Sequence, residues 1–208
     1  EMAGAVTLDE QTALTNEVIR AQRQMLSAEL HRPVDGIPQT FVPYKEVLDI
    51  YDNGVELPED VTLMWCDDNY GYITRLSNAA EQARSGGAGV YYHVSYYGKP
   101  HDYLWLATSQ PALMAAEMRR AWDCGARKIW ILNVGDLKPA EYHTELFLDM
   151  AWNADAVAPE KVGEHQRCWL EREFGPDVAP RAAALMREHY RLAAERKPEH
   201  MGWSRIQQ

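Results

Sequence analysis

An unbroken apolar run at residues 61–66 leads directly into Asp67-Asp68-Asn69, and this pattern limits the possible folds more than any other feature of the chain. A strand that is apolar at every position is buried on both faces, which is typical of a parallel sheet covered by helices. Strand-like runs at 88–97 and 128–134 also end in polar residues. The sequence therefore predicts an α/β fold whose polar side chains gather at the carboxyl ends of parallel strands.

Helices are predicted between these strands. Apolar residues at helical spacing indicate a helix over 8–30, and a short strand at 39–44 is followed by a helix over 45–51. Further helices are predicted over 111–126 and from Pro139 onward. A doubly wound sheet or a barrel fits this alternation, but polar residues at several strand ends favour the barrel. The four predicted strands correspond to about four βα units of a (β/α)8 TIM-type barrel.

The chain changes character after Asn153. Two amphipathic helices are expected at 164–174 and 178–196, with Ala and Leu at a spacing typical of helical bundles. We therefore expect residues 1–153 to form part of a (β/α)8 catalytic barrel and residues 154–208 to begin a helical-bundle domain.

The charge balance argues against two classes of partner. Lys plus Arg number 21 against 31 Asp plus Glu, so the net charge is −10 and a basic face for nucleic acid is not expected. The same balance argues against docking on an anionic membrane. No apolar run approaches the ~20 residues that a membrane span needs, and no signal peptide is visible at the N-terminus. We expect neither nucleic acid nor a membrane as a partner.

The sequence carries no motif for a cofactor or a metal. The glycine-rich segment 85–89 precedes a strand, whereas phosphate-binding loops follow one. Three distant cysteines without a CxxC pair are expected to be buried free thiols. No HExxH motif is present, and the eight-residue spacing of His93 and His101 is a weak metal signal. We therefore expect no cofactor and no metal.

The adjacent carboxylates Asp67 and Asp68 are the first candidate site. They should repel each other, so at least one of them needs a cationic, amide or substrate partner. Because successive side chains on an extended backbone point in opposite directions, one carboxylate is expected to face a cleft while the other braces the loop. In the alternative interpretation, one of them caps a turn with Asn69 ahead of Gly71.

A second cluster lies on the strand at 88–97, which is rich in Tyr, His and Ser and is costly to bury unless each polar group finds a partner. Alternation places Tyr91, His93 and Ser95 on one face, while Tyr92 lies on the other. The pair His101-Asp102 follows this strand. The alternative for His93 is a core histidine whose hydrogen bonds are satisfied.

A third cluster follows the strand at 128–134 and contains Asn133, Asp136 and Lys138. Its amide, carboxylate and ammonium can hydrogen-bond a polyhydroxylated or anionic ligand. The alternative is an ordinary strand–helix loop in which Asp136 is a cap. Glu117 lies in a predicted helix, where it is expected to pair with Arg120 on a solvated or structural helix face.

Several long and uncommon strings in the chain resemble glycoside hydrolase family 115. The resemblance covers nearly the whole chain past about Pro43. The strings include Cys66-Asp67-Asp68-Asn69-Tyr70-Gly71-Tyr72 with Arg75-Leu76-Ser77, residues 86–93 through Ser95-Tyr96, residues 100–105, residues 133–141, residues 147–152 and residues 196–203.

The resemblance implies an α-glucuronidase that removes (4-O-methyl-)glucuronic acid, α-1,2-linked to xylan, with inversion. Family members are large and multidomain, with a (β/α)8 barrel followed by a helical domain, and they are commonly dimeric. We therefore expect this chain to be an internal portion of a secreted or periplasmic homo-oligomeric enzyme, inactive by itself. Its expected partner is glucuronoxylan or its oligosaccharides. Tyr97 stands where the family commonly has Trp.

An inverting glycosidase needs a general acid and a general base, ~6.5–9.5 Å apart. On the resemblance, the candidates are Asp67 or Asp68 together with Asp136, with Asp102 in reserve. The expected substrate-binding residues are Asn69, Tyr92, His93, His101, Asp102 and Asn133, with Lys138 and Arg75 as cations for the sugar carboxylate. Two alternatives stay open, namely a non-catalytic carbohydrate-binding module and an inert fragment of a larger enzyme.

Overall fold

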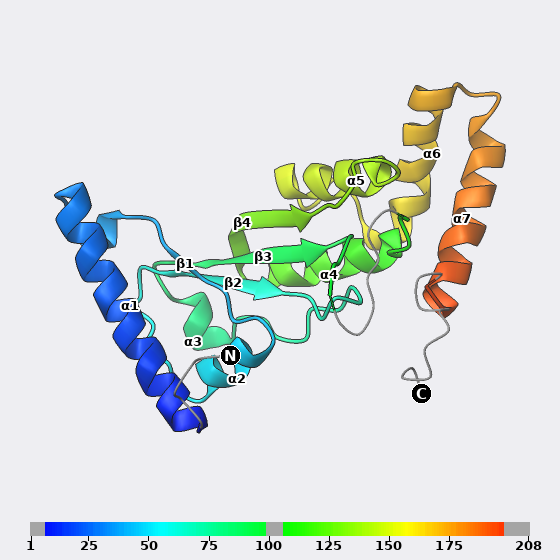
Figure 1. Cartoon of the computed structure of the whole chain (residues 1–208). Helices are drawn as coiled ribbons and strands as arrows, with labels where there is room; N and C mark the ends of the chain where they lie inside the picture. The colour runs from blue at the N-terminus through cyan, green and yellow to red at the C-terminus, as the bar shows by residue number, and fades with distance from the viewer. Residues whose placement is uncertain (1–6, 99–105, 198–208) are drawn as a thin grey trace. The chain divides into compact units, whose positions relative to one another are not determined.

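The computed structural model describes residues 7–98 and 106–197 (Figure 1). Four strands form one sheet in the order β1-β2-β3-β4, and β1 pairs with β2 in parallel, with Thr40 opposite Thr62. The strands alternate with helices, which confirms the predicted α/β fold. The strands are β1 (Thr40–Phe41), β2 (Thr62–Cys66), β3 (Ala88–His93) and β4 (Ala126–Asn133).

Helix α1 precedes the first strand, and further helices lie between the strands. After β4, the described part of the chain contains helices and no further strand. The helix predicted over 8–30 is confirmed and begins with a capping box between Thr7 and Glu10. The helices are α1 (Leu8–Leu30), α2 (Glu46–Asp52), α3 (Ala79–Gln82), α4 (Pro111–Asp123), α5 (Glu141–Trp152), α6 (Val162–Phe174) and α7 (Ala179–Glu195), with short 3-10 turns η1 (Val34–Gly36) and η2 (Pro159–Lys161).

The strand predicted to be buried on both faces is buried. In β2, every residue except Cys66 is buried, and Leu63, Met64 and Trp65 are at most 2% exposed. In β3, all residues except Tyr91 are buried. Because side chains alternate along a strand, burial of consecutive residues means that both faces of these strands are covered.

Glycines just before β3 and within its first residues allow close backbone contact. A Cβ at Gly86 would lie 2.3 Å from the Val61 carbonyl oxygen, and one at Gly89 would lie 2.2 Å from the Ile129 carbonyl oxygen. These glycines therefore serve strand packing.

The chain divides into two compact units. The first contains Glu1–Cys66, Arg75–Val90 and Cys124–Ile129, and within it α1 packs against α2. The second contains Asp67–Thr74, Tyr91–Asp123 and Trp130–Gln208.

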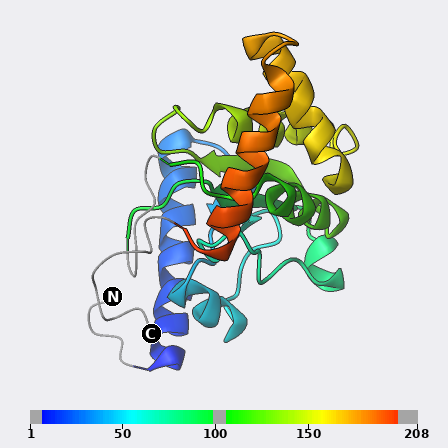
Figure 2. The ribbon, with the colours of Figure 1, turned by 90° about the vertical axis from the view of Figure 1, so that its right-hand side faces the viewer.

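Within the second unit, α4 packs against α5, and α6 and α7 lie side by side as a helical pair (Figure 2). Among the described helices, none combines the length and the apolar character needed to cross a bilayer.

Candidate functional site

Asp67 lies directly after β2, and both oxygens of its buried carboxylate accept hydrogen bonds. Its Oδ1 accepts the backbone N–H of His93 at 3.0 Å and lies 2.6 Å from His93 Nδ1. Its Oδ2 accepts the backbone N–H groups of Asn69 at 3.0 Å and Gly71 at 3.3 Å. The side chain is 0% exposed. Asp67 is thus the carboxylate that braces the loop, one of the two roles expected for the Asp67–Asp68 pair.

Asp68 is the exposed member of the pair. Its Oδ1 accepts the backbone N–H of Tyr70 at 2.8 Å and that of Tyr72 at 3.1 Å, and its own N–H donates to the Tyr72 carbonyl. These bonds close a compact turn around Gly71. Since Asp68 Oδ2 has no hydrogen bond among the described residues, this carboxylate retains acceptor capacity at the surface.

Tyr92 supports the same loop from β3. Its hydroxyl donates to the Gly71 carbonyl at 2.9 Å, and Tyr92 is fully buried. A Cβ at Gly71 would lie 2.9 Å from that hydroxyl, and Gly71 has a φ of 98°, so both space and conformation favour glycine here. Asn69 is buried with a φ of 67°, in the left-handed region that asparagine tolerates. Tyr92 and Asn69, both expected to bind sugar, thus contribute to the architecture of the loop.

His93 ends β3 and is 5% exposed. Its ring lies edge-on to Tyr91 at 5.0 Å and to Tyr96 at 5.8 Å between ring centroids. When Asp67 accepts the Nδ1–H hydrogen bond, the neutral imidazole carries its lone pair on Nε2. The Asp67–His93 pair therefore fixes the tautomer of a histidine at the carboxyl end of the strand.

Helix α4 also contacts the loop at residues 67–73, through Ile73. Glu117 accepts the backbone N–H of Ile73 at 2.8 Å, and Arg120 contacts both Glu117 and the Ile73 carbonyl. The expected pairing of Glu117 with Arg120 is confirmed, and of the two expected faces the structure shows the structural one, since the Glu117 side chain is 12% exposed. Loop 67–73 is therefore held from β3 and from α4.

The third predicted cluster lies at the end of β4. The Asn133 carbonyl accepts the backbone N–H groups of Val94 at 3.1 Å and Ser95 at 3.3 Å. Asp136 is exposed, and no hydrogen bond or ion pair involves its side chain within the described ranges. Lys138 is 88% exposed and donates to Glu141 at 2.8 Å, which raises the pKa of Lys138. The predicted cation thus already has an acidic partner. His101 and Asp102 lie outside the described residues.

Arg75, the other predicted cation, belongs to a network in the first unit. It donates to both oxygens of Glu81 at 2.7 and 2.8 Å, reaches Asp52 at 3.4 Å and lies over the Trp65 ring at 4.6 Å. Burial alone would raise the pKa of Glu81, but hydrogen bonds from Arg75, the Asn78 N–H and Tyr51 outweigh it and lower that pKa. Burial and the neighbouring Glu81 raise the pKa of Tyr51 to about 12. Arg75 therefore has a structural role here.

Substitution of Arg75 by glutamine is expected to lower the free energy of unfolding by about 2 kcal/mol, because it leaves the partly buried Glu81 without its cation. Urea denaturation of the two proteins measures this difference. Arg20→Gln is the matched control, since Arg20 lies exposed on α1 with no ion pair among the described residues. Equal losses in the two variants would contradict the structural role of Arg75.

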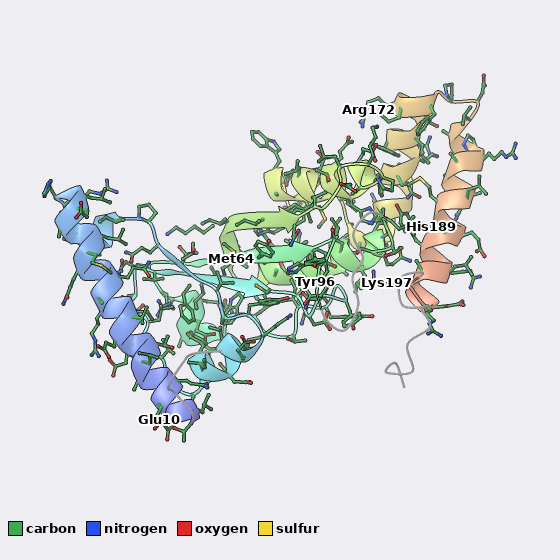
Figure 3. The ribbon with its side chains drawn as sticks, viewed as in Figure 1. Glu10, Met64, Tyr96, Arg172, His189 and Lys197 are labelled. Carbon is green, nitrogen blue, oxygen red and sulfur yellow. The ribbon has the colours of Figure 1, made fainter. Side chains whose placement is uncertain are left out.

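One group of potential metal ligands occurs among the described residues, formed by Glu145, Asp149 and His165. Arg172 donates to both oxygens of Glu145 at 2.6 and 2.8 Å (Figure 3 labels Arg172), and His165 Nε2 lies 3.0 Å from Asp149. The group contains none of the predicted site residues, and its charges already have partners.

The sequence interpretation treated Asp67 and His93 separately and missed their direct contact. A signal for it was present, because the carboxyl ends of neighbouring parallel strands meet at one edge of a sheet. A carboxylate ending one strand and a histidine ending the next are therefore candidates for pairing.

Comparison with known proteins places these features in context. The model of Glycosyl hydrolase family 115 matches residues 3–200. A solved structure of BtGH115A, described as a family GH115 4-O-methyl-alpha-glucuronidase with specificity for decorated arabinogalactans, superimposes with a TM-score of 0.91 at 56% sequence identity. The match covers 97% of this chain and 27% of that chain. A comparison with curated proteins found no match.

Proposed function

Because the chain belongs to glycosyl hydrolase family 115, we propose that it is part of an α-glucuronidase that releases (4-O-methyl-)glucuronic acid from a polysaccharide. The chain spans 27% of the relative's length, which supports the proposal that it is one portion of a larger enzyme. We further propose that residues 1–153 are part of a (β/α)8 catalytic barrel, that residues 154–208 begin a helical domain, and that the whole enzyme is a homo-oligomer.

The observation that carries this proposal is the buried Asp67–His93 pair, which lies beside an exposed second carboxylate at the carboxyl ends of β2 and β3. In our proposal, Asp67 positions His93, and His93 holds a sugar hydroxyl or the attacking water. Asp68 and Asp136, both exposed on loops that follow strands, are then the proposed catalytic carboxyl groups. This proposal selects Asp68 rather than Asp67 as a catalytic carboxyl group, because both oxygens of Asp67 already accept hydrogen bonds from groups of this chain.

The proposed reaction proceeds with inversion. One carboxylic acid gives its proton to the glycosidic oxygen as the bond from that oxygen to the anomeric carbon breaks. The other carboxylate takes a proton from water, whose oxygen attacks the anomeric carbon from the opposite face. The products are free glucuronic acid and a polysaccharide with a new hydroxyl group. Which of Asp68 and Asp136 is the acid is left open.

Two polysaccharides are candidates for the substrate. The resemblance in the sequence implies α-1,2-linked glucuronic acid on xylan, whereas the solved relative is described as specific for decorated arabinogalactans. We propose glucuronoxylan or its oligosaccharides as the substrate, with arabinogalactan as the competing class.

Chromatographic measurement of free (4-O-methyl-)glucuronic acid tests the proposal. The enzyme containing this chain is incubated with glucuronoxylan and, separately, with a glucuronic acid-decorated arabinogalactan. We expect acid release from glucuronoxylan, with an α-anomer substrate giving a β-anomer product in proton NMR. Release only from arabinogalactan would overturn the substrate assignment. Binding of either polysaccharide without release would identify a carbohydrate-binding module instead.

The 208-residue chain is assayed beside the whole enzyme. We expect it to be inactive alone, because the proposed barrel needs further strands to complete its site. Activity in this chain would show that both catalytic carboxyl groups lie within it.

A further inference from the structure

Three consecutive residues just before α4, at 107–109, are buried although they belong to no helix or strand. Thr108 is 1% exposed, and Ala107 and Ser109 are 8% and 7% exposed. Buried polar backbone outside regular structure needs hydrogen-bond partners from other parts of the chain. The elements that supply these partners therefore fix the place at which α4 begins.

Helix α7 and the residues after it supply two of the partners. The Ala107 carbonyl accepts a hydrogen bond from His189 Nε2 at 2.9 Å, and Lys197 Nζ donates to Thr108 Oγ1 at 3.2 Å. Figure 3 labels both basic residues, His189 on α7 and Lys197 beyond its end. Two residues of segment 107–109 are thus bound by side chains that lie 82 and 89 residues later in the chain.

Helix α5 binds the third residue of the segment. His143 Nε2 donates to the Ser109 carbonyl at 2.7 Å, and His143 is completely buried. The Tyr190 ring of α7 packs edge-on against the His143 ring at 5.3 Å between ring centroids, and Tyr190 is only 4% exposed. Segment 107–109 is therefore held at each of its residues, and the helices that hold it contact each other.

The start of α4 in turn contacts the turn that carries Asp68. A Cβ at Gly71 would lie 3.1 Å from Leu113 Cδ2, so the first turn of α4 packs on the glycine around which the Asp68 turn closes. Glu117, one helical turn later, accepts the backbone N–H of Ile73 at 2.8 Å. Because protein interiors are close-packed, a shift at the start of α4 is expected to move this turn.

We propose that His189 and Lys197 are positioning residues that hold the Asp68 turn in place through the start of α4. Both lie within residues 154–208, so the proposed helical domain acquires a role in catalysis, namely to fix the place from which Asp68 acts. Coupling of this kind runs through packed side chains and hydrogen bonds, and all of these contacts lie within the second unit. The catalytic part of this proposal rests on the proposed function of Asp68.

Amide hydrogen exchange of the whole enzyme, followed by mass spectrometry, tests the positioning itself. In the double variant His189→Leu and Lys197→Met, we expect the peptide at residues 67–74 to exchange about tenfold faster, the factor expected for the loss of one or two hydrogen bonds. The conservative double variant His189→Gln and Lys197→Arg keeps both donors and should restore the original exchange. Arg187→Leu is the matched control, because Arg187 is exposed on α7 and makes no hydrogen bond to the segment before α4.

Release of glucuronic acid measures the consequence for catalysis. We expect kcat to fall at least about tenfold in the double variant His189→Leu and Lys197→Met, with KM nearly unchanged, since a displaced catalytic group weakens the transition state more than the bound substrate. The conservative double variant should recover the original kcat. A triple variant that adds Asp68→Asn should be no slower than Asp68→Asn alone. Multiplied losses would overturn the proposal, because the two basic residues would then act independently of Asp68.

Three further results would overturn the proposal. Unchanged exchange at residues 67–74 in the first double variant would mean that α7 does not hold the Asp68 turn, whatever the rates. Faster exchange throughout the enzyme, together with a lower unfolding temperature, would show a general loss of stability. Faster exchange at residues 67–74 with a normal kcat would exclude the role in catalysis. If the original enzyme releases no glucuronic acid, the proposed function fails, whereas faster exchange confined to residues 67–74 still supports the link between α7 and the turn.

Discussion

Replacement of Asp67 by asparagine is expected to lower kcat for glucuronic acid release by about 10²–10⁴-fold, as in enzymes whose catalytic histidine loses its buried carboxylate partner. The Asp67 carboxylate accepts every hydrogen bond that it makes, from three backbone N–H groups and from His93 Nδ1. An asparagine amide has one acceptor oxygen, and its NH₂ group would face N–H donors that it cannot accept from. The variant therefore loses the hydrogen bonds that fix the His93 tautomer and the loop at residues 67–73.

A double-mutant cycle separates positioning from simple loss of stability. If Asp67 acts through His93, the variant with both Asp67→Asn and His93→Gln should be no slower than His93→Gln alone. Multiplied losses in the double variant would mean that Asp67 acts on its own. Unfolding temperatures are measured for all variants, and rates are taken below the lowest transition.

Asp68→Asn is expected to behave differently. The exposed Asp68 makes hydrogen bonds to two backbone N–H groups through one oxygen only, which asparagine can retain. We therefore expect kcat to fall by at least about 10²-fold with little change in unfolding temperature. Asp177→Asn, another exposed carboxylate in the same unit, is the matched control. Near-normal rates for both Asp67→Asn and Asp68→Asn would exclude this loop from catalysis.

Elements with a strong local signal could be predicted from the sequence. Helix α1 has apolar periodicity and a capping box at Thr7, and its predicted limits are correct. β2 was predicted as a doubly buried strand because every residue in the run 61–66 is apolar or small. In both cases the local pattern and the packing agree.

Other elements depend on contacts that the sequence does not display. Helix α3 is a single turn fixed by a capping box between Asn78 and Glu81, too short for any periodicity. The strand predicted to reach residue 97 ends at His93, because the backbone N–H groups of Val94 and Ser95 both donate to the Asn133 carbonyl. Tertiary hydrogen bonds therefore override the alternating pattern after His93.

The same distinction applies to the site. Its place at the strand ends follows from the fold class, but the role of each group depends on its nearest partner. The positive charges of Arg75 and Lys138 are evident from the sequence. In the structure, however, Arg75 forms an ion pair with Glu81, and Lys138 forms one with Glu141. Asp67 and Asp68 are chemically identical neighbours, and only the fold makes one buried and the other exposed.

A second large effect is expected from His143, a completely buried histidine on α5. Its Nε2 lies 2.7 Å from the Ser109 carbonyl, and its Nδ1 has no hydrogen-bond partner in the described part of the chain. The Tyr190 ring packs edge-on at 5.3 Å between ring centroids. The nearby basic side chains are His189 near the end of α7, bonded to the Ala107 carbonyl, and Lys197 after it, bonded to Thr108 (Figure 3).

Burial is the largest effect on His143 and lowers its pKa from the usual 6.5 to about 4. The hydrogen bond with the Ser109 carbonyl is the second largest effect and opposes this shift, while repulsion from Lys197 and His189 adds to it. Between these two values the unfolded chain binds a proton that the folded chain excludes, so stability falls as pH falls. The contribution is complete above pH 6.5 and lost progressively toward pH 4. The loss in unfolding free energy is expected to be about 3 kcal/mol.

Urea denaturation between pH 7 and pH 4 measures this loss, and His143→Gln isolates it. Glutamine can donate to the Ser109 carbonyl but stays neutral, so the variant should lose about 3 kcal/mol less than the original protein over this range. Carboxylates that titrate near pH 4 affect both proteins equally and cancel in the difference. His31→Asn, at an exposed position with a φ of 51° that asparagine tolerates, should keep the original pH dependence. Parallel pH profiles for the original protein and His143→Gln would mean that His143 is already protonated, or solvated, in the folded state.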